Sequence, residues 1–435
     1  MKIHTIGGYE KVGGNMTAVD VDDRIVIFDM GADIEKTKQS GKNWGTITRK
    51  EAIKMEAIPD DSELKQKKNE VVAIVVGHGH QDHCLGIPKL ADDYDCPIIA
   101  TPYTISTIRR IVENDVEKVN NELVALNPGE TYEIASDLEL EFVPITHSIP
   151  QTVIPVLKTG EGLLVYSLDF KIDDEPTLGD PFDEIKFNEL RREGIRALIV
   201  DCTRVDEPGV TSSESQVRDD LERVLDKTYN EETGAMITTF SSHIARIKNI
   251  IAANQGRRKI AALGRSLKEY LTDAEEHGLI DLSDIKITKN HFEIERLLSK
   301  ASKNKSEYLL LVTGSQGEPN AILSRISRDE YPYNLEAGEV VIFSSSIIPT
   351  STDVFNNSLL KRRLQKKGVK IENDVHSHGH GRRMDHLRLF RILDPETVIP
   401  AHGGKNKQSS CAELAREENI DSVLVSKNKE TIFLD

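Results

Sequence analysis

GHGHQDH, the sequence of residues 77–83, contains three histidines and one aspartate. It follows VVAIVV at residues 71–76, an apolar run that is rich in β-branched residues and of strand length. The polar cluster therefore lies in a loop at the end of a buried strand. Imidazole nitrogens and carboxylate oxygens are the usual ligands of zinc and similar divalent ions. The stretch predicts a metal site, and the simpler alternative is a solvated polar turn.

The composition is that of a soluble globular protein. Of 435 residues, 38% are hydrophobic and 29% are charged, which suits two or three domains. No apolar run reaches membrane-spanning length and the N-terminus lacks a signal-peptide pattern, so we expect a cytoplasmic protein with no membrane partner. The four cysteines lack CxxC spacing, which predicts free thiols.

The formal net charge of −16 argues against simple nucleic-acid binding. Affinity for phosphate normally comes from clustered lysine and arginine. Any polyanion would have to bind a local basic patch, such as residues 361–363 (KRR). Each such patch taken alone is more commonly an ordinary solvated surface.

Two isolated candidate ligands follow predicted strands in the next block. His147 comes after residues 139–146 and Asp169 comes after residues 162–168. Either residue alone is more commonly an ordinary loop residue. Ends of strands along one edge of a sheet converge in space, however, so both side chains could complete coordination spheres begun by residues 77–83.

Changes in the pattern of predicted strands and helices divide the chain into three parts. Short strand-like runs with glycine turns at residues 3–31 predict antiparallel hairpins, and the lysine-rich residues 32–70 predict a long loop with a short helix, as a lid or an interface. Strands and helices then alternate regularly, which predicts a parallel sheet with helices on both faces. We expect domain parts at residues 1–208, 209–351 and 352–435.

Several turns near the C-terminal half carry polar or histidine-rich sequences. Ser344, Ser345 and Ser346 follow a predicted strand, where such a turn can bind a phosphate or simply cap a helix. Two histidine-bearing turns come later, HSHGHG at residues 376–381 and AHGG at residues 401–404.

The order of these elements resembles known metallohydrolases. H-x-H-x-D-H, a single histidine, a single aspartate and a late histidine before glycine resemble the metallo-β-lactamase fold. A domain inserted after residues 201–203 (DCT), followed by residues 376–381 and PAHG at 400–403, is similar to the β-CASP nucleases. The resemblance implies an α/β fold, an αββα sandwich whose inserted β-CASP domain, a parallel sheet flanked by helices, forms the far wall of a nucleic-acid cleft.

Four further motifs narrow the resemblance to the ribonuclease J family, and because the chain stops at Asp435 without the extra C-terminal domain of bacterial members, it resembles the shorter archaeal form. The four motifs are TGSQGEP at residues 313–319, LSRI at 323–326, FSSSIIP at 343–349 and LGRS at 263–266. The family has a serine where this chain has His378. That departure concerns a serine associated with holding the 5′ phosphate.

The resemblance implies a catalytic centre with two Zn²⁺ ions per subunit, for which Mn²⁺ or Mg²⁺ are alternatives. Asp82 would also be catalytic, and His380 matches the general acid that protonates the leaving oxygen, with Asp201 orienting its ring. The implied ligands are His78, His80, His147 and Asp169 for one ion, and Asp82, His83, His402 and the same Asp169 for the other.

The resemblance also implies the substrate and partners. We expect a ribonuclease that degrades single-stranded RNA mainly from the 5′ end, favours a 5′ monophosphate, and also cuts internally, in RNA processing and decay. We expect a homodimer that associates with other RNA-decay factors. The residues expected to bind the 5′ phosphate are Ser344, Ser345, Ser346, His376 and His378.

Three alternative functions remain at this point. A DNA-directed β-CASP nuclease would share most of the pattern. A small-molecule metallohydrolase would share the metal cluster but would have no use for an inserted domain. A catalytically silent RNA-binding scaffold would have lost ligands, and this sequence retains all of them.

Overall fold

The computed structural model describes residues 1–434, which form two compact units. The sandwich unit comprises residues 1–172, 180–211 and the chain from Gly379 onward, and the inserted unit comprises residues 173–179 and 212–378. The inserted unit thus extends well beyond residue 351, where the sequence analysis ended it. The reason is that β17 (Lys370–Glu372) pairs with β16 (Val340–Phe343) and completes the sheet of this unit.

Two seven-stranded sheets form the centre of the sandwich unit. The first has the order β20-β1-β2-β3-β4-β5-β6 and the second β19-β18-β11-β10-β9-β8-β7. The strands of the first sheet are β1 (Lys2–Gly7), β2 (Met16–Val21), β3 (Arg24–Phe28), β4 (Val71–Val76), β5 (Ile98–Ala100), β6 (Leu123–Ala125) and β20 (Glu430–Phe433). Those of the second are β7 (Thr131–Ala135), β8 (Leu138–Pro144), β9 (Val153–Thr159), β10 (Gly162–Ser167), β11 (Ile195–Asp201), β18 (Thr397–Ala401) and β19 (Ser422–Val423).

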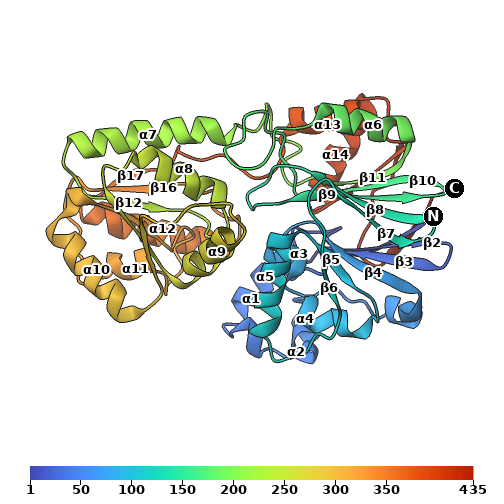
Figure 1. The fold of residues 1–435 in the computed structure, drawn as a ribbon, viewed down its shortest axis with the longest axis horizontal. Helices are drawn as coiled ribbons and strands as arrows, with labels where there is room; N and C mark the ends of the chain where they lie inside the picture. The colour runs from blue at the N-terminus through green and yellow to red at the C-terminus, as the bar shows by residue number, and fades with distance from the viewer. Residues whose placement is uncertain (435) are drawn as a thin grey trace. The chain divides into compact units, whose positions relative to one another are not determined.

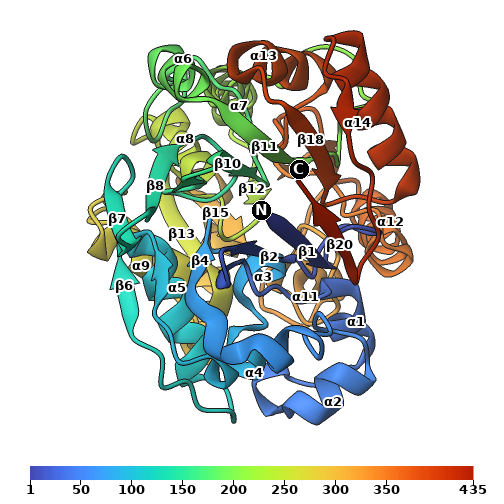
Figure 2. The same ribbon diagram turned by 90° about the vertical axis from the view of Figure 1, so that its right-hand side faces the viewer.

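Helices cover the outer face of each sheet. Figure 2 shows α1 (Ile34–Gln39), α2 (Arg49–Lys54) and α4 (Ile87–Leu90) on the side of the first sheet, and α6 (Glu184–Glu193), α13 (Arg383–Leu393) and α14 (Lys405–Glu417) on the side of the second. Separate apolar cores fill the space between the sheets and the space under each helical layer. Strand β4 contributes to two of these cores, which is why its sequence is continuously apolar instead of alternating. The expected αββα sandwich is confirmed.

The segment between β3 and β4 is folded against the first sheet and contains more helix than the long loop with a short helix that was predicted there. It contains α1, η1 (Trp44–Thr46), α2 and η2 (Leu64–Glu70). Trp44 packs on the apolar core under the sheet, and its indole nitrogen donates to the carbonyl oxygen of Leu85 at 3.1 Å. Helix α2 begins with a capping box between Thr48 and Glu51. This structure leaves little trace in the sequence, because its apolar positions are few and widely spaced.

The inserted unit has one parallel sheet of six strands, in the order β14-β13-β15-β12-β16-β17. Figure 1 shows α7 and α8 along one face and α10 and α11 along the other. Carboxyl ends of parallel strands meet at one edge, which brings loops from distant parts of the chain together. The further elements are β12 (Ala235–Thr238), β13 (Lys259–Leu263), β14 (Ile285–Thr288), β15 (Tyr308–Val312), α7 (Glu214–Asn230), α8 (Ile244–Asn254), α9 (Arg265–Glu276), α10 (His291–Lys303), α11 (Ile322–Ser327) and α12 (Ser351–Lys366).

Within residues 1–434, no helix is long and apolar enough to cross a membrane. All four cysteines are buried free thiols, as their spacing predicted.

Candidate functional site

The predicted metal ligands lie at strand ends of the sandwich unit. Residues 77–80 form the loop after β4, and the short helix α3 (Gln81–Cys84) follows directly. The remaining ligands come from loops after three strands of the second sheet. These ligands are His147 after β8, Asp169 after β10 and His402 after β18.

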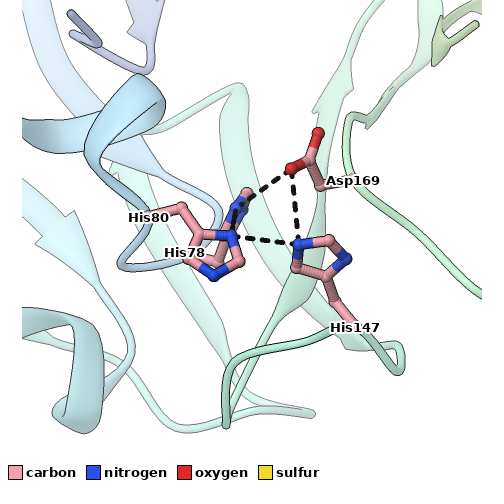
Figure 3. Close-up of side chains that lie close together, drawn as sticks. All are labelled: His78, His80, His147 and Asp169. Atoms are coloured by element: carbon pink, nitrogen blue, oxygen red, sulfur yellow. Dashed lines mark hydrogen bonds and ion pairs between the residues drawn. The ribbon is translucent and has the colours of Figure 1, made fainter. Parts of the chain in front are cut away.

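The first group of ligands consists of His78, His80, His147 and Asp169, whose side chains lie close together in Figure 3. His80 Nδ1 lies 3.2 Å from His78 Nε2 and 3.0 Å from His147 Nε2. Asp169 Oδ2 lies 3.4 Å from the Nε2 atoms of both His78 and His147. The four ligand atoms lie within 4.8 Å of one another. These four side chains therefore point toward a common centre, which suits a single ion.

The second group shares Asp169 with the first. Asp169 Oδ2 lies 3.3 Å from His83 Nε2, and Asp169 Oδ1 lies 3.3 Å from His402 Nε2. Asp82 Oδ2 lies 3.6 Å from His402 Nε2 and 3.8 Å from His83 Nε2. The structure thus brings together all seven predicted ligands as two adjacent groups with one common carboxylate.

Three of the histidines are oriented by hydrogen bonds at Nδ1. In each case the partner is an oxygen that can accept a hydrogen bond, so Nδ1 donates and its hydrogen bond fixes the orientation of the ring. Nε2 of each ring lies 3.3 to 3.4 Å from an oxygen of Asp169. The pairs are His83 with Asp29 Oδ2 (2.7 Å), His402 with Asn15 Oδ1 (2.8 Å) and His147 with the carbonyl oxygen of Gly379 (2.6 Å).

Asp29 and Asn15 are functional residues that the sequence analysis missed. Asp29 also accepts hydrogen bonds from the backbone of Gly77 at 3.2 Å and from the hydroxyl of Tyr166 at 3.0 Å. Its position directly after β3, like that of the ligands after their own strands, was an available signal. Asn15 donates to the carbonyl oxygen of Asp82 at 3.1 Å, and its glycine-rich surroundings gave no comparable signal.

The electrostatics of the site suit a divalent cation. Burial would raise the pKa of Asp169, but His402 and His83 outweigh burial and hold that pKa well below its usual range. Asp169 Oδ1 is buried and has no hydrogen-bond partner among residues 1–434. A buried polar atom without a partner commonly lowers the free energy of unfolding by about 1–3 kcal/mol. Burial lowers the pKa of His80 and of His147 well below the usual value, so both rings are neutral. A carboxylate with unused lone pairs beside neutral imidazoles fits such an ion.

Backbone conformation also marks the site. Asp29, Asp169 and His402 have φ angles of 59°, 56° and 55°. Non-glycine residues in this left-handed region are uncommon and concentrate at functional sites. Gly31 is required by close packing, because a Cβ atom there would lie 1.6 Å from the carbonyl oxygen of Asp82.

His380 and Asp201 form a hydrogen-bonded pair at the edge of the metal site. His380 Nδ1 lies 2.8 Å from Asp201 Oδ2 and 4.0 Å from Asp169 Oδ1. The side chain of His380 is 24% exposed, whereas that of Asp201 is fully buried. Burial lowers the pKa of His380, but Asp169 and Asp201 outweigh it and raise the pKa to about 9. His380 therefore carries a proton at neutral pH in the metal-free protein.

The residues predicted to bind phosphate all belong to the inserted unit, but one of them has another use. Ser344 is buried, donates to the carbonyl oxygen of Val375 at 2.7 Å and accepts from Arg246 Nη1 at 2.9 Å. Its hydroxyl is therefore engaged within the fold. By contrast, Ser345 Oγ and His376 Nε2 are buried and lack a hydrogen-bond partner within residues 1–434.

The other two predicted phosphate residues flank this region. The carbonyl oxygen of Ser346 accepts from Gln316 Nε2 at 2.9 Å, which ties the loop after β16 to the loop after β15. The ring of His378 lies edge-on to that of His376, with 4.7 Å between centroids. His378, which replaces the serine of the family, thus packs beside one of the unpartnered donors.

Comparison with known proteins agrees with this architecture. Family models match as "Beta-lactamase superfamily domain" at residues 47–208, "Ribonuclease J, beta-CASP domain" at 232–361 and "Zn-dependent metallo-hydrolase RNA specificity domain" at 367–425. A solved structure of a protein of unknown function from Enterococcus faecalis V583 has a TM-score of 0.71 and covers 99% of both chains. Its sequence is only 16% identical, so this likeness concerns the fold alone.

Two archaeal proteins are similar over nearly their whole length. Ribonuclease J of Pyrococcus abyssi is 39% identical and aligns with 98% of this chain and 96% of its own length. Ribonuclease J of Methanocaldococcus jannaschii is also 39% identical, with 96% and 94% covered. With the β-CASP insertion and the His/Asp site in place, this chain belongs to the ribonuclease J family and is a metal-dependent ribonuclease.

Proposed function

We propose that this ribonuclease degrades single-stranded RNA mainly in the 5′-to-3′ direction, favours a 5′-monophosphate end and makes internal cuts as a secondary activity. The observation that carries the end preference is the pair of unpartnered donors, Ser345 Oγ and His376 Nε2, in the inserted unit. A terminal phosphate has more free acceptor oxygens than an internal phosphodiester, and a 5′ hydroxyl has none of them. Two unsatisfied donors therefore favour the phosphorylated end.

The proposed metals are two Zn²⁺ ions, with Mn²⁺ or Mg²⁺ as alternatives. One would be held by the group around His80 and the other by the group around His83, with Asp169 common to both. When bound, divalent ions acidify water and offset the negative charge that develops on phosphoryl oxygens. The support for this assignment is the convergence of ring nitrogens and carboxylate oxygens around Asp169.

His380 is the proposed general acid. The Nδ1–H group of His380 donates a hydrogen bond to Asp201 Oδ2, so the proton to be donated in the reaction is the one on Nε2. The backbone nitrogen of Thr203 donates to Asp201 Oδ1 at 2.8 Å, which holds the carboxylate in place. Protonation of the departing 3′ oxygen by His380 would complete phosphodiester hydrolysis. Asp82, a member of the second group, is also proposed to position water by accepting a hydrogen bond.

The experiment that tests this function uses RNA and DNA of identical sequence, each with a 5′ monophosphate or a 5′ hydroxyl and a label at either end. We expect mononucleotides from the 5′ end of RNA, faster with the monophosphate, and no products after chelation. Shortening from the 3′ end would refute the polarity. Equal rates on the two kinds of 5′ end would refute the end preference, and equal rates on DNA would favour a DNA-directed nuclease.

We also infer a cytoplasmic homodimer that associates with other RNA-decay factors. The four unpaired cysteines support a reducing compartment. The dimer and the further partners rest on membership of the family alone. Light scattering of the purified protein tests the dimer, and a monomer at micromolar concentration would refute it.

A further inference from the structure

Arg246, on helix α8, is the centre of a buried hydrogen-bond network in the inserted unit. Its side chain is fully buried. Nε and Nη2 donate to the two carboxylate oxygens of Glu214 at 2.9 and 2.6 Å, a bidentate arrangement. Nη2 also donates to the carbonyl oxygen of Ser377 at 3.1 Å, and Nη1 donates to the carbonyl oxygen of Ser344 at 2.8 Å.

Arg246 also contacts His376, and this contact determines the tautomer of the ring. Arg246 Nη1 lies 3.0 Å from His376 Nδ1. A guanidinium group has only donors, so Nδ1 must be the acceptor and must be unprotonated. Burial and the charge of Arg246 lower the pKa of His376 far below its usual value, so the ring is neutral. The single ring proton is therefore on Nε2.

That Nε2–H group has no acceptor among residues 1–434, although it is buried. A second buried group without a partner is the hydroxyl of Ser345. Ser345 lies in the loop after β16 and His376 in the loop after β17, and these two strands are parallel neighbours. Buried donors without partners are rare in proteins and are costly. An anionic oxygen that accepts from them would remove this cost. The two groups are thus suited to a phosphate ligand.

Arg246 itself is not suited to bind the phosphate. Each of its N–H groups already has an acceptor in Glu214, Ser344, Ser377 or His376. Its charge is balanced by Glu214, whose carboxylate also accepts from Asn249 Nδ2 at 3.1 Å. Arg246 can therefore act on a ligand only through the groups that it holds.

We propose that Arg246 is a positioning residue for recognition of the 5′ phosphate: it holds His376 as the Nε2–H tautomer, so that a fixed, uncharged donor faces the terminal phosphate. This inference rests on the proposed function, because it concerns the same two donors. Recognition then depends on the geometry of neutral donors and not on a general attraction for phosphate. That property suits an enzyme that must distinguish one terminal phosphate from the many phosphodiesters of the same strand.

A matched pair of substitutions at His376 tests the direction of the donor. His376→Gln can place an amide N–H near the position of Nε2, whereas His376→Asn can keep an acceptor for Arg246 but lacks the distal donor. The readout is the ratio of initial rates on 5′-monophosphate and 5′-hydroxyl RNA of one sequence. We expect His376→Asn to lower this ratio about tenfold, the effect of one lost hydrogen bond, and His376→Gln to retain most of it. A ratio preserved in His376→Asn, or lost equally in both variants, would overturn the proposal.

The tautomer can be measured directly in the metal-loaded wild-type protein. Long-range ¹H–¹⁵N spectra of protein with labelled histidines report which ring nitrogen is protonated, and the signals missing in His376→Asn identify His376. We expect a proton on Nε2 only. A proton on Nδ1, or on both nitrogens, would overturn the role of Arg246.

Arg246→Met then tests the cause, with Arg218→Met on exposed Arg218 of α7 as the control. We expect Arg246→Met to lower the ratio and to allow both His376 tautomers, and the control to change neither. A folded Arg246→Met protein with an unchanged ratio would contradict the proposal. If this variant does not fold, the wild-type spectrum and the pair at His376 still decide. Equal wild-type rates on both ends would refute the proposed function itself, whereas a clear preference with a proton on Nδ1 would refute only this inference.

Discussion

At the scale of single residues, His380 and His376 show that the fold can hold the same type of side chain in two different protonation states. Asp201 and Asp169 stabilise the charged form of His380, whose pKa rises to about 9. Arg246 and burial exclude the charged form of His376. The first ring can therefore release a proton, and the second can only present one. These partners, and not the histidines themselves, account for the different roles that we propose.

Removal of the imidazole at position 380 should abolish turnover without removing metal. We expect His380→Ala to lower kcat about 10²–10⁴-fold, the usual contribution of a general acid. Metal content, measured by mass spectrometry of the purified protein, should stay at the wild-type value. His291→Ala is the control, because His291 is an exposed histidine of the inserted unit. Normal turnover by His380→Ala would contradict the assignment.

The raised pKa of His380 also predicts how the metal-free protein responds to pH. The pKa is 6.5 in the ordinary state and about 9 in the fold, so the ion pairs of His380 contribute full stability below pH 6.5 and lose it as the pH rises through about 9. We expect wild-type protein in chelator to unfold at a higher temperature than His380→Gln below pH 6.5. This difference should disappear above pH 9. A difference that is constant with pH would show that His380 is not charged in the metal-free fold.

At the scale of elements, ligands come from the ends of strands while the residues that orient them come from neighbouring strand ends. Asp29, after β3, holds the ring of His83, which follows β4. β3 and β4 are parallel neighbours, so their carboxyl ends lie at the same edge. The close approach of Gly31 to Asp82 keeps these two loops together. The sheet thereby positions both the ligand and its partner.

Substitution of Asp29 should weaken the second group of ligands selectively. Asn tolerates the left-handed conformation of residue 29, so Asp29→Asn should fold, but it removes the carboxylate that accepts from His83. We expect metal affinity at the second group to fall about 10–100-fold, measured by competition with a chelator, while the first group changes little. Asp22→Asn is the control, since Asp22 is exposed and also has a positive φ angle of 50°. Equal affinity in both variants would contradict an orienting role for Asp29.

At the scale of the whole molecule, a chain with a formal charge of −16 acts on a polyanion. Much of the acidity is neutralised locally, as between Arg49 and Asp61, or in the buried pair of Arg246 and Glu214. Asp169 and Asp82 add further negative charge in the ligand groups of the sandwich unit. Metal binding there would offset this charge at the place where we propose that phosphodiesters are cleaved.

Metal removal should destabilise the sandwich unit more than the inserted unit. A ligand at about 100 times its Kd stabilises the native state by about 2.7 kcal/mol, and this contribution is lost on chelation. Hydrogen exchange should therefore accelerate in the loops after β4, β10 and β18 and remain unchanged in β12, β15 and β16. Addition of Zn²⁺ should restore protection. Equal acceleration in both units, or none in the loops, would contradict the assignment of the metal centre to the sandwich unit.

The sequence by itself determined the fold class and the residues brought together at the metal site. Continuous apolar strands followed by polar side chains are a local pattern, and so is the alternation of strands and helices that revealed the inserted sheet. The motifs of the family named the remaining residues of interest. These features can be read locally because they depend on the spacing of residues along one strand or loop.

Only the tertiary structure decided which partners these residues have. Asn15 meets His402 across 387 positions of sequence, and no local pattern connects them. Ser344 lies in a turn typical of phosphate binding, yet the fold uses its hydroxyl to bind Arg246 and Val375. The inserted unit extends beyond residue 351 because β17 completes its sheet. In each case the physical reason is the same: a hydrogen bond is formed with whichever group the packed strands bring near, and that choice is made in three dimensions.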